Sequence, residues 1–220
     1  MSTNCAIFWD HSNIFGGMRN IAASRESPAV VSDVRIHYES LFELAHAHRP
    51  VSKALCVTSS NAPDVTGVTG SLSSIGLEVE LYERGPRTHG EQAVDQALQV
   101  HMLRALVDQP PGVAVLLTGD GAGYDRGAGF LADLERMHRG GWAVEVLAWK
   151  GSCNRYLRTW AGKHGLYIPL DDFYQNITFV KDLRRQKPFS RPPRRIAEMP
   201  TSSTPKSVNQ RCIFATATTA

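Results

Sequence analysis

The sequence contains few cysteines, and none of them lies close to another. Four occur in 220 residues, with no Cys-x-x-Cys pair and no Cys/His spacing typical of a zinc site, at Cys5, Cys56, Cys153 and Cys212. This spacing argues against a structural zinc site and against a disulfide framework. Isolated thiols are typical of proteins in a reducing compartment, so we expect a cytoplasmic protein.

Long apolar runs are missing as well. No apolar stretch approaches the roughly 18–20 residues that a membrane-spanning helix needs, and therefore no membrane partner is expected. Residues 1–4 are polar and lead directly into an apolar run, unlike the charged and apolar regions of a signal peptide. Neither a GxSxG nucleophile turn nor a Walker A motif occurs, and we find no internal repeat.

The composition is that of an ordinary globular protein. Apolar residues make up 42% of the chain and charged residues 20%, which argues against wholesale disorder. A length of 220 residues suffices for one domain with some excess, and for a core that needs no disulfides.

Basic residues concentrate toward the C-terminus. From Lys181 onward the chain has nine basic residues and two acidic ones, whereas the net charge of the whole chain is only +3. Proline, serine and threonine dominate beyond residue 185, so we assign 4–180 to one domain and 185–220 to a disordered basic tail. The tail either reaches a polyanionic partner or is a solvated segment without one.

Strand-like and helix-like segments alternate along the expected domain. Short apolar runs predict strands at 6–9, 54–57, 77–82, 113–117, 142–148 and 166–168. Helical spacing predicts helices at 34–48, 64–75, 91–107, 127–139 and 154–163, with a loop at 23–33 and a capping turn or short helix at 171–179. This alternation predicts a three-layer, Rossmann-like α/β domain with a mainly parallel central sheet.

Two of the expected strands are followed by an aspartate, Asp10 in one case and Asp120 in the other. Sites in parallel sheets form outside the carboxyl ends of the strands, so these carboxylates lie within reach of each other if the strands are neighbours. Like charges at such a distance repel unless a cation neutralises them. Oxygen ligands alone favour a hard cation such as Mg²⁺ or Mn²⁺.

Further polar residues accompany this pair. Asp95 lies near the start of the long helix expected from residue 91, where it can face the same edge of the sheet. Asn13 follows Asp10 by one helical turn and offers a neutral amide that can orient a carboxylate, a water or a phosphate. Asp125 lies in a glycine-rich loop after Asp120, and glycine lets the backbone approach a metal or a phosphate closely.

Three motifs resemble those of one protein family. Residues 8–13 (Phe-Trp-Asp-His-Ser-Asn), 92–98 (Gln-Ala-Val-Asp-Gln-Ala-Leu) and 116–121 (Leu-Leu-Thr-Gly-Asp-Gly) look like the first, second and third motifs of the NYN domains. These domains are a branch of the PIN-like nuclease superfamily. The order and rough spacing of the motifs also match, and the resemblance covers about residues 4–180.

The resemblance implies a metal-dependent ribonuclease with a Rossmann-like sheet, Mg²⁺ or Mn²⁺ as cofactor and RNA as partner. Carried over to this sequence, it assigns metal binding to Asp10, Asp95 and Asp120 and a supporting catalytic role to Asn13. Asp125 is a further candidate ligand, through a longer loop. In the hypothesis, the metal lowers the pKa of a bound water that then attacks the phosphodiester.

A single-stranded substrate is favoured, because a cleft can follow its backbone and stack its bases on aromatic side chains. Tyr124 and Trp149 are candidates for stacking, and core packing is an equal alternative for Trp149. The candidates for substrate contact come from segments next to the expected site, and they are Ser12, Arg87, Lys150, Arg155 and Arg158. The oligomeric state stays open.

Two rival interpretations remain. The first is a catalytically weak or inactive module that binds RNA or a protein, favoured by His101 and Ala122, which stand where many family members have an acidic residue. The second is a nucleotide-binding oxidoreductase, suggested by the glycines at 119, 121 and 123. Their spacing is not GxGxxG, and an aspartate inside the turn would repel a pyrophosphate.

Overall fold

A six-stranded, all-parallel sheet forms the centre of the molecule. The computed structural model describes residues 3–60, 64–82, 91–124, 127–189 and 195–200. The strands are β1 (Cys5–Asp10), β3 (Val51–Ser59), β4 (Glu78–Tyr82), β5 (Val113–Leu117), β6 (Ala143–Ala148) and β7 (Leu166–Pro169). They lie in the order β4-β3-β1-β5-β6-β7, each parallel to its neighbours.

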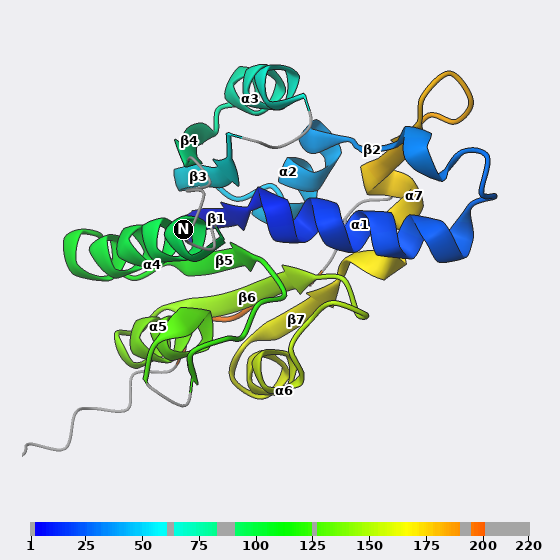
Figure 1. Ribbon diagram of the computed structural model, residues 1–220. Helices are drawn as coiled ribbons and strands as arrows, with labels where there is room; N and C mark the ends of the chain where they lie inside the picture. Colours follow the sequence, from blue (N-terminus) through cyan, green and yellow to red (C-terminus); the bar gives the residue numbers. More distant parts are fainter. Residues whose placement is uncertain (1–2, 61–63, 83–90, 125–126, 190–194, 201–220) are drawn as a thin grey trace, which may run out of the picture.

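Helices cover both faces of this sheet, as Figure 1 shows. One face carries α1 (His11–Arg25), α2 (Tyr38–His46), α3 (Val65–Ser74) and α7 (Tyr174–Ile177), and the other carries α4 (Glu91–Asp108), α5 (Gly129–Arg139) and α6 (Arg155–His164). Strand β1 is buried on both faces, because Ile7 and Trp9 point into the first layer while Ala6 and Phe8 point into the second. The predicted three-layer α/β fold is confirmed.

The prediction of one helix over 34–48 was wrong in its first part. Val34–Ile36 forms strand β2, which pairs antiparallel with β8 (Thr178–Val180) in a separate two-stranded sheet. Val34 and Ile36 are buried while Arg35 is exposed, which is the alternation of a strand rather than of a helix. Helix α2 begins only at Tyr38, where the His37 ring accepts a hydrogen bond from the N–H of Ser40.

Two other boundaries also differ from the predictions. Helix α1 continues to Arg25, so the expected loop at 23–33 is shorter and includes a 3-10 turn at Val31–Asp33. The expected capping turn at 171–179 consists of a 3-10 helix, Leu170–Phe173, then α7, and then the first residues of β8. Strand β8 pairs with a segment far away in sequence, which local periodicity does not reveal.

The described parts of the expected tail contact the folded body. Phe189 lies with its ring 6.2 Å from that of Phe173, and Ala197 is only 9% exposed. The N–H of Ala197 donates to the buried carboxylate of Glu145 at 2.7 Å. These stretches are therefore placed against the domain, while the division of the chain at residues 180 and 185 stays a prediction.

The strand order shows where a ligand site is expected in this sheet. From β1 the chain passes to β3 and β4 on one side, and from β5 it passes to β6 and β7 on the other. The direction of winding therefore reverses between β1 and β5, and the carboxyl ends of these two strands form the usual ligand site of such sheets. No helix in the described parts of the chain is both long enough and apolar enough to cross a bilayer.

Candidate functional site

Asp10 occupies the switch from β1 to α1. It is the last residue of the strand and the N-cap of the helix, where aspartate is favoured because its carboxylate accepts from a free N–H of the first turn. Its Oδ1 accepts a hydrogen bond from the N–H of Asn13 at 3.0 Å, and only 4% of the residue is exposed. The carboxylate is therefore held in one place at the carboxyl edge of the sheet.

Thr118 connects Asp10 to the end of β5. The parallel register pairs Trp9 with Leu117, which places the next residues of the two strands side by side. The Thr118 hydroxyl donates to Asp10 Oδ2 at 3.0 Å and accepts from the N–H of Asp120 at 3.2 Å. One buried hydroxyl thus fixes both aspartate segments relative to each other.

Asn13 ties the start of α1 to the same loop. Its Oδ1 accepts a hydrogen bond from the N–H of Gly119 at 2.8 Å. A Cβ on Gly119 would lie 2.7 Å from the carbonyl oxygen of Ser152, and one on Gly121 would lie 2.5 Å from Cγ of Asn154. Only glycine lets this loop rest on the loop between β6 and α6. Asn13 therefore positions the loop of Asp120.

Asp95 and Asp120 line one pocket of about 260 Å³, which we call the acidic pocket. Its walls come from the first turns of α4, with Gln96 and Gln99 beside Asp95, and from the loop between β5 and α5, with Ala122 beside Asp120. The N–H of Ala122 donates to Asp120 Oδ1 at 3.0 Å, which orients this half-buried carboxylate. The structure thus places two of the predicted ligands, from separate segments of the chain, in the lining of one pocket.

The acidic pocket offers carboxylate oxygens, which are the ligand type that hard cations prefer. In the described part of the chain, no group of three or more His, Cys, Asp or Glu side chains is arranged to hold a metal ion. Mg²⁺ commonly takes one or two carboxylates and completes its shell with water and substrate phosphate. Asp95 and Asp120 supply two such carboxylates, whereas Asp10 does not line the pocket and is linked through Thr118 to the backbone of Asp120. Asp125 lies outside the described residues.

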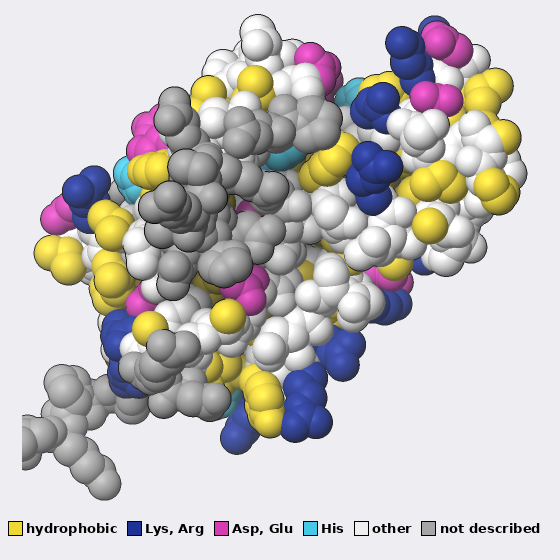
Figure 2. Space-filling view, in the orientation of Figure 1, with side chains coloured by type: hydrophobic (Ala, Val, Ile, Leu, Met, Phe, Trp, Pro, Cys, Tyr) yellow, Lys and Arg dark blue, Asp and Glu magenta, His cyan; other side chains and the backbone are white. Residues whose placement is uncertain are grey.

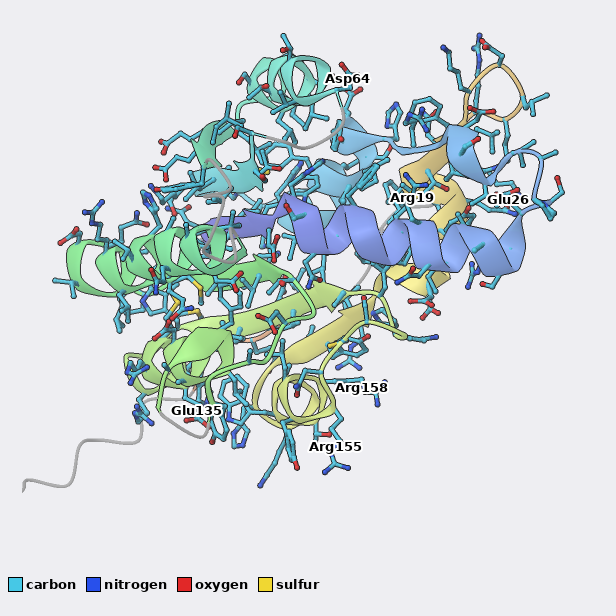
Figure 3. All side chains as sticks on the ribbon, in the orientation of Figure 1. Arg19, Glu26, Asp64, Glu135, Arg155 and Arg158 are labelled. Carbon is cyan, nitrogen blue, oxygen red and sulfur yellow. The ribbon has the colours of Figure 1, made fainter. Side chains whose placement is uncertain are left out.

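The residues predicted to contact the substrate lie in different environments. Lys150 donates from its Nζ to Asp172 at 2.8 Å and from its N–H to Asp171 at 2.7 Å, so it is engaged in local contacts. Arg155 and Arg158 are exposed on α6, and Figure 3 shows both on the outer side of that helix. Ser12 is half-buried in the first turn of α1, beside Asp10. Arg87 lies outside the described residues.

The two aromatic candidates also differ. Trp149 is 1% exposed and its Nε1 donates to the carbonyl of Ile14 at 2.8 Å, so it is a core residue and not a stacking platform. Tyr124 is 39% exposed and lies on the loop between β5 and α5, with its hydroxyl donating to Glu135 at 2.9 Å. Of the two, only Tyr124 is accessible to a base.

His11 follows Asp10 but is not available to a metal or a phosphate. It is 2% exposed, with Nδ1 at 3.1 Å from the Thr58 hydroxyl and Nε2 at 3.0 Å from the Tyr38 hydroxyl. Burial lowers the pKa of His11 from 6.5 to about 4, so the ring is neutral at physiological pH.

Sequence reasoning missed three contributors to the site. Thr118 stands in the motif Thr-Gly-Asp, but nothing in a single sequence shows that its hydroxyl bridges two strands. Gln96 and Gln99 line the acidic pocket beside Asp95, and the spacing of four residues between Asp95 and Gln99 is the signal that indicates one helix face.

These features define a class of protein. In this parallel α/β sheet, Asp10 and Asp120 follow the neighbouring strands β1 and β5 at the switch point, which is the usual ligand edge of such sheets. The sequence model of the family described as NYN domain matches residues 4–161, which is more than half of the chain. The chain therefore belongs to the NYN domain family, within the PIN-like nuclease superfamily. No curated protein and no solved structure matches it.

The family match supports a nuclease-like, RNA-related function. NYN proteins are generally nuclease-like hydrolases, and PIN-like nucleases typically use divalent metals.

Proposed function

We propose that this protein is a metal-dependent ribonuclease that hydrolyses phosphodiester bonds of single-stranded RNA. The observation that carries the proposal is the shared acidic pocket of Asp95 and Asp120 at the switch point of the sheet. Two acidic side chains that line one pocket repel each other, and a bound cation would relieve that repulsion.

In this proposal Asp95 and Asp120 hold Mg²⁺ or Mn²⁺, and Asp10 supports the site. When bound, such an ion activates a water and neutralises charge on the phosphate. The protein contributes positioning: Thr118 and Asn13 fix Asp10, while the N–H of Ala122 fixes Asp120. Placing groups before the reaction is one of the largest sources of rate enhancement in phosphoryl transfer.

Replacing Asp120 by Asn tests the proposal. Asn keeps the shape and can still accept from the N–H of Ala122, so the fold is expected to persist. We expect the rate of Mn²⁺-dependent RNA cleavage to fall by about 10²-fold or more, because a metal carboxylate is lost. Asp10→Asn is also expected to slow cleavage, because Asp10 supports the site through Thr118. The measurement is the cleavage rate of a labelled single-stranded RNA at equal concentrations of folded protein.

The matched control is Asp108→Asn, an exposed aspartate at the end of α4 and far along the helix from Asp95. It removes the same charge and should leave cleavage unchanged. Equal activity of the Asp120 variant and the control would refute the ribonuclease assignment.

A binding module is the second candidate function. The observation that favours it is the lack of a three-residue acidic cluster among the described side chains. His101 also has a local partner, since its Nε2 lies 2.8 Å from Glu80 Oε1. In that case titration calorimetry would detect RNA binding that does not depend on Mn²⁺, and no RNA would be cut.

A further inference from the structure

A second and larger pocket lies on the other helical layer. It has a volume of about 690 Å³ and is enclosed by α1, α2, α3 and β8, so we call it the α1–α3 pocket. Figure 2 shows the surface hollowed between α3 and α1, with aromatic or aliphatic side chains beside Lys and Arg. The volume falls within the range of about 300–1,000 Å³ that is usual for small-ligand sites.

Aromatic side chains line this pocket. Phe15 of α1, Tyr38 of α2 and Phe179 of β8 each contribute to the wall and are only partly buried. Aromatic rings are the surfaces on which proteins stack the unpaired bases of single-stranded RNA.

Basic side chains line the same pocket. Arg19, Arg35 and Lys181 all line the pocket and are exposed. Within the described residues, neither Arg19 nor Lys181 has a carboxylate partner. Guanidinium and ammonium groups beside stacking rings are suited to the phosphates that flank a bound base.

Two carboxylates complete the lining, Asp64 and Glu39. Figure 3 shows Asp64 at the end of α3 nearest to α1, with Arg19 on α1 below it. In the described parts of the chain neither carboxylate forms an ion pair. A carboxylate accepts hydrogen bonds only, so it selects a ligand edge that donates. Guanine presents two adjacent donors, N1–H and N2–H, whereas uracil presents a single one.

His11 contacts two residues that line this pocket and is the chain neighbour of Asp10. The ring of His11, which directly follows Asp10, stacks on Phe15 with centroids 5.7 Å apart and an angle of 16°. Its Nε2 lies 3.0 Å from the hydroxyl of Tyr38. His11 therefore supports two walls of the α1–α3 pocket and directly follows Asp10, which lies at the switch point of the sheet.

We propose that the α1–α3 pocket binds one unstacked base of a single-stranded RNA whose backbone passes the acidic pocket, with a preference for guanine over uracil. This proposal rests on the proposed function for the identity of the ligand. Phe15 and Tyr38 supply the stacking surface, Arg19 and Lys181 hold the flanking phosphates, and Asp64 or Glu39 accepts from the base edge.

The test measures RNA binding without cleavage. Full-length protein carrying Asp120→Asn is titrated into fluorescently labelled oligouridylate, with or without one central guanosine, and anisotropy gives the affinity at several salt concentrations. We expect the guanosine to increase the affinity. Asp64→Asn or Glu39→Gln is expected to abolish that increase. Asn also tolerates the left-handed backbone of position 64, where φ is 55°.

Arg19→Ala should weaken binding of both oligonucleotides equally and reduce the slope of log affinity against log salt by about 0.7. The matched control is Arg139→Ala, an exposed arginine at the end of α5 that does not line the pocket. Phe15→Leu keeps the core apolar and should weaken binding by about 5-fold or more, because a stacking ring is lost.

The proposal is overturned if the guanosine has no effect on affinity, or if the Asp64 and Glu39 variants both keep the preference. It is also overturned if Arg19→Ala behaves like the control. Failure of the ribonuclease proposal looks different: the wild-type protein would leave RNA intact in Mn²⁺, while the guanosine preference and its loss in the pocket variants would persist.

Discussion

Two buried carboxylates of the same sheet are held in opposite ways. Glu145, in the first half of β6, is fully buried, and Arg49 donates to its two oxygens at 2.9 and 2.8 Å. Asp10, at the carboxyl end of β1, is 4% exposed and accepts from a hydroxyl and a backbone N–H. The first carboxylate is matched by a fixed cation, whereas these donors to the second supply no positive charge.

The contacts of Glu145 are those of a carboxylate that stabilises the fold. Arg49 also donates to the carbonyls of Ala45 and His46, and the N–H of Ala197 donates to Glu145. Such a satisfied pair connects α2, β6 and a late segment of the chain. At the switch point, the N–H of Asn13 and the hydroxyl of Thr118 orient Asp10 at the edge of the sheet where such folds usually bind ligands.

Removing one partner of the Arg49–Glu145 ion pair should give the largest change in stability. We expect Arg49→Ala to lower the free energy of unfolding by about 3–5 kcal/mol, because Glu145 would be left buried without its partner. Urea denaturation followed by circular dichroism measures this. The double variant Arg49→Met with Glu145→Leu should recover most of the loss, since two apolar side chains need no partner. A loss below about 0.5 kcal/mol for the single variant would contradict the comparison.

At the site of Asp10, Thr118→Val should lower stability by a smaller amount and should slow RNA cleavage. Valine keeps the shape but removes the hydroxyl that donates to Asp10 and accepts from the N–H of Asp120. We expect RNA cleavage to slow by about 10–100-fold, as for other groups that orient metal ligands, while stability falls by only about 1 kcal/mol. Thr118→Ser keeps the hydroxyl and should retain activity. Equal rates for the two variants would show that the bridge has no role.

A third carboxylate, the half-buried Glu26, has one neutral and one charged donor. Removing the neutral donor should give the smallest effect. Glu26 accepts from the Tyr174 hydroxyl at 3.0 Å and from Arg184 at 3.0 Å, and Figure 3 shows it at the far end of α1 from the site. Tyr174→Phe removes one donor, with Arg184 still present, so we expect a loss of about 1 kcal/mol at neutral pH.

The same variant has a defined dependence on pH. Burial, together with the neighbouring Glu26, raises the pKa of Tyr174 from 10.0 to about 12. Because the folded pKa is higher than the unfolded one, the contribution to stability is complete below pH 10 and is lost as the pH rises toward 12. Urea denaturation across this range should show a smaller alkaline loss for Tyr174→Phe than for the wild type.

The central sheet could be predicted because its signals are local. The strand at 113–117 and the helix at 91–107 were predicted almost to the residue, since one is a continuous apolar run and the other lacks Gly and Pro. Strand β2 was not predicted, because three residues are too few to show a period and the partner strand β8 lies more than a hundred residues away. Pairing at such a distance is decided by tertiary contacts.

The candidate site was predicted in part for the same reason. Motifs pointed to Asp10, Asp95 and Asp120, and the structure places the last two around one pocket. For Trp149 the sequence left stacking and core packing open, and the structure shows it buried, with its Nε1 donating to the carbonyl of Ile14. Burial of a tryptophan depends on neighbours that a sequence does not name. The α1–α3 pocket was not predicted at all, since its walls come from segments between residues 15 and 181.

The alternation of strands and helices, the acidic residues at strand ends and the family could all be recognised in the amino-acid sequence. These properties follow from the order of neighbouring residues. Only the tertiary structure decided that Thr118 bridges Asp10 to the loop of Asp120, that Arg49 neutralises Glu145 and that His11 is buried between two pocket walls. Hydrogen bonds and burial act over a few ångströms in space, whatever the separation along the chain.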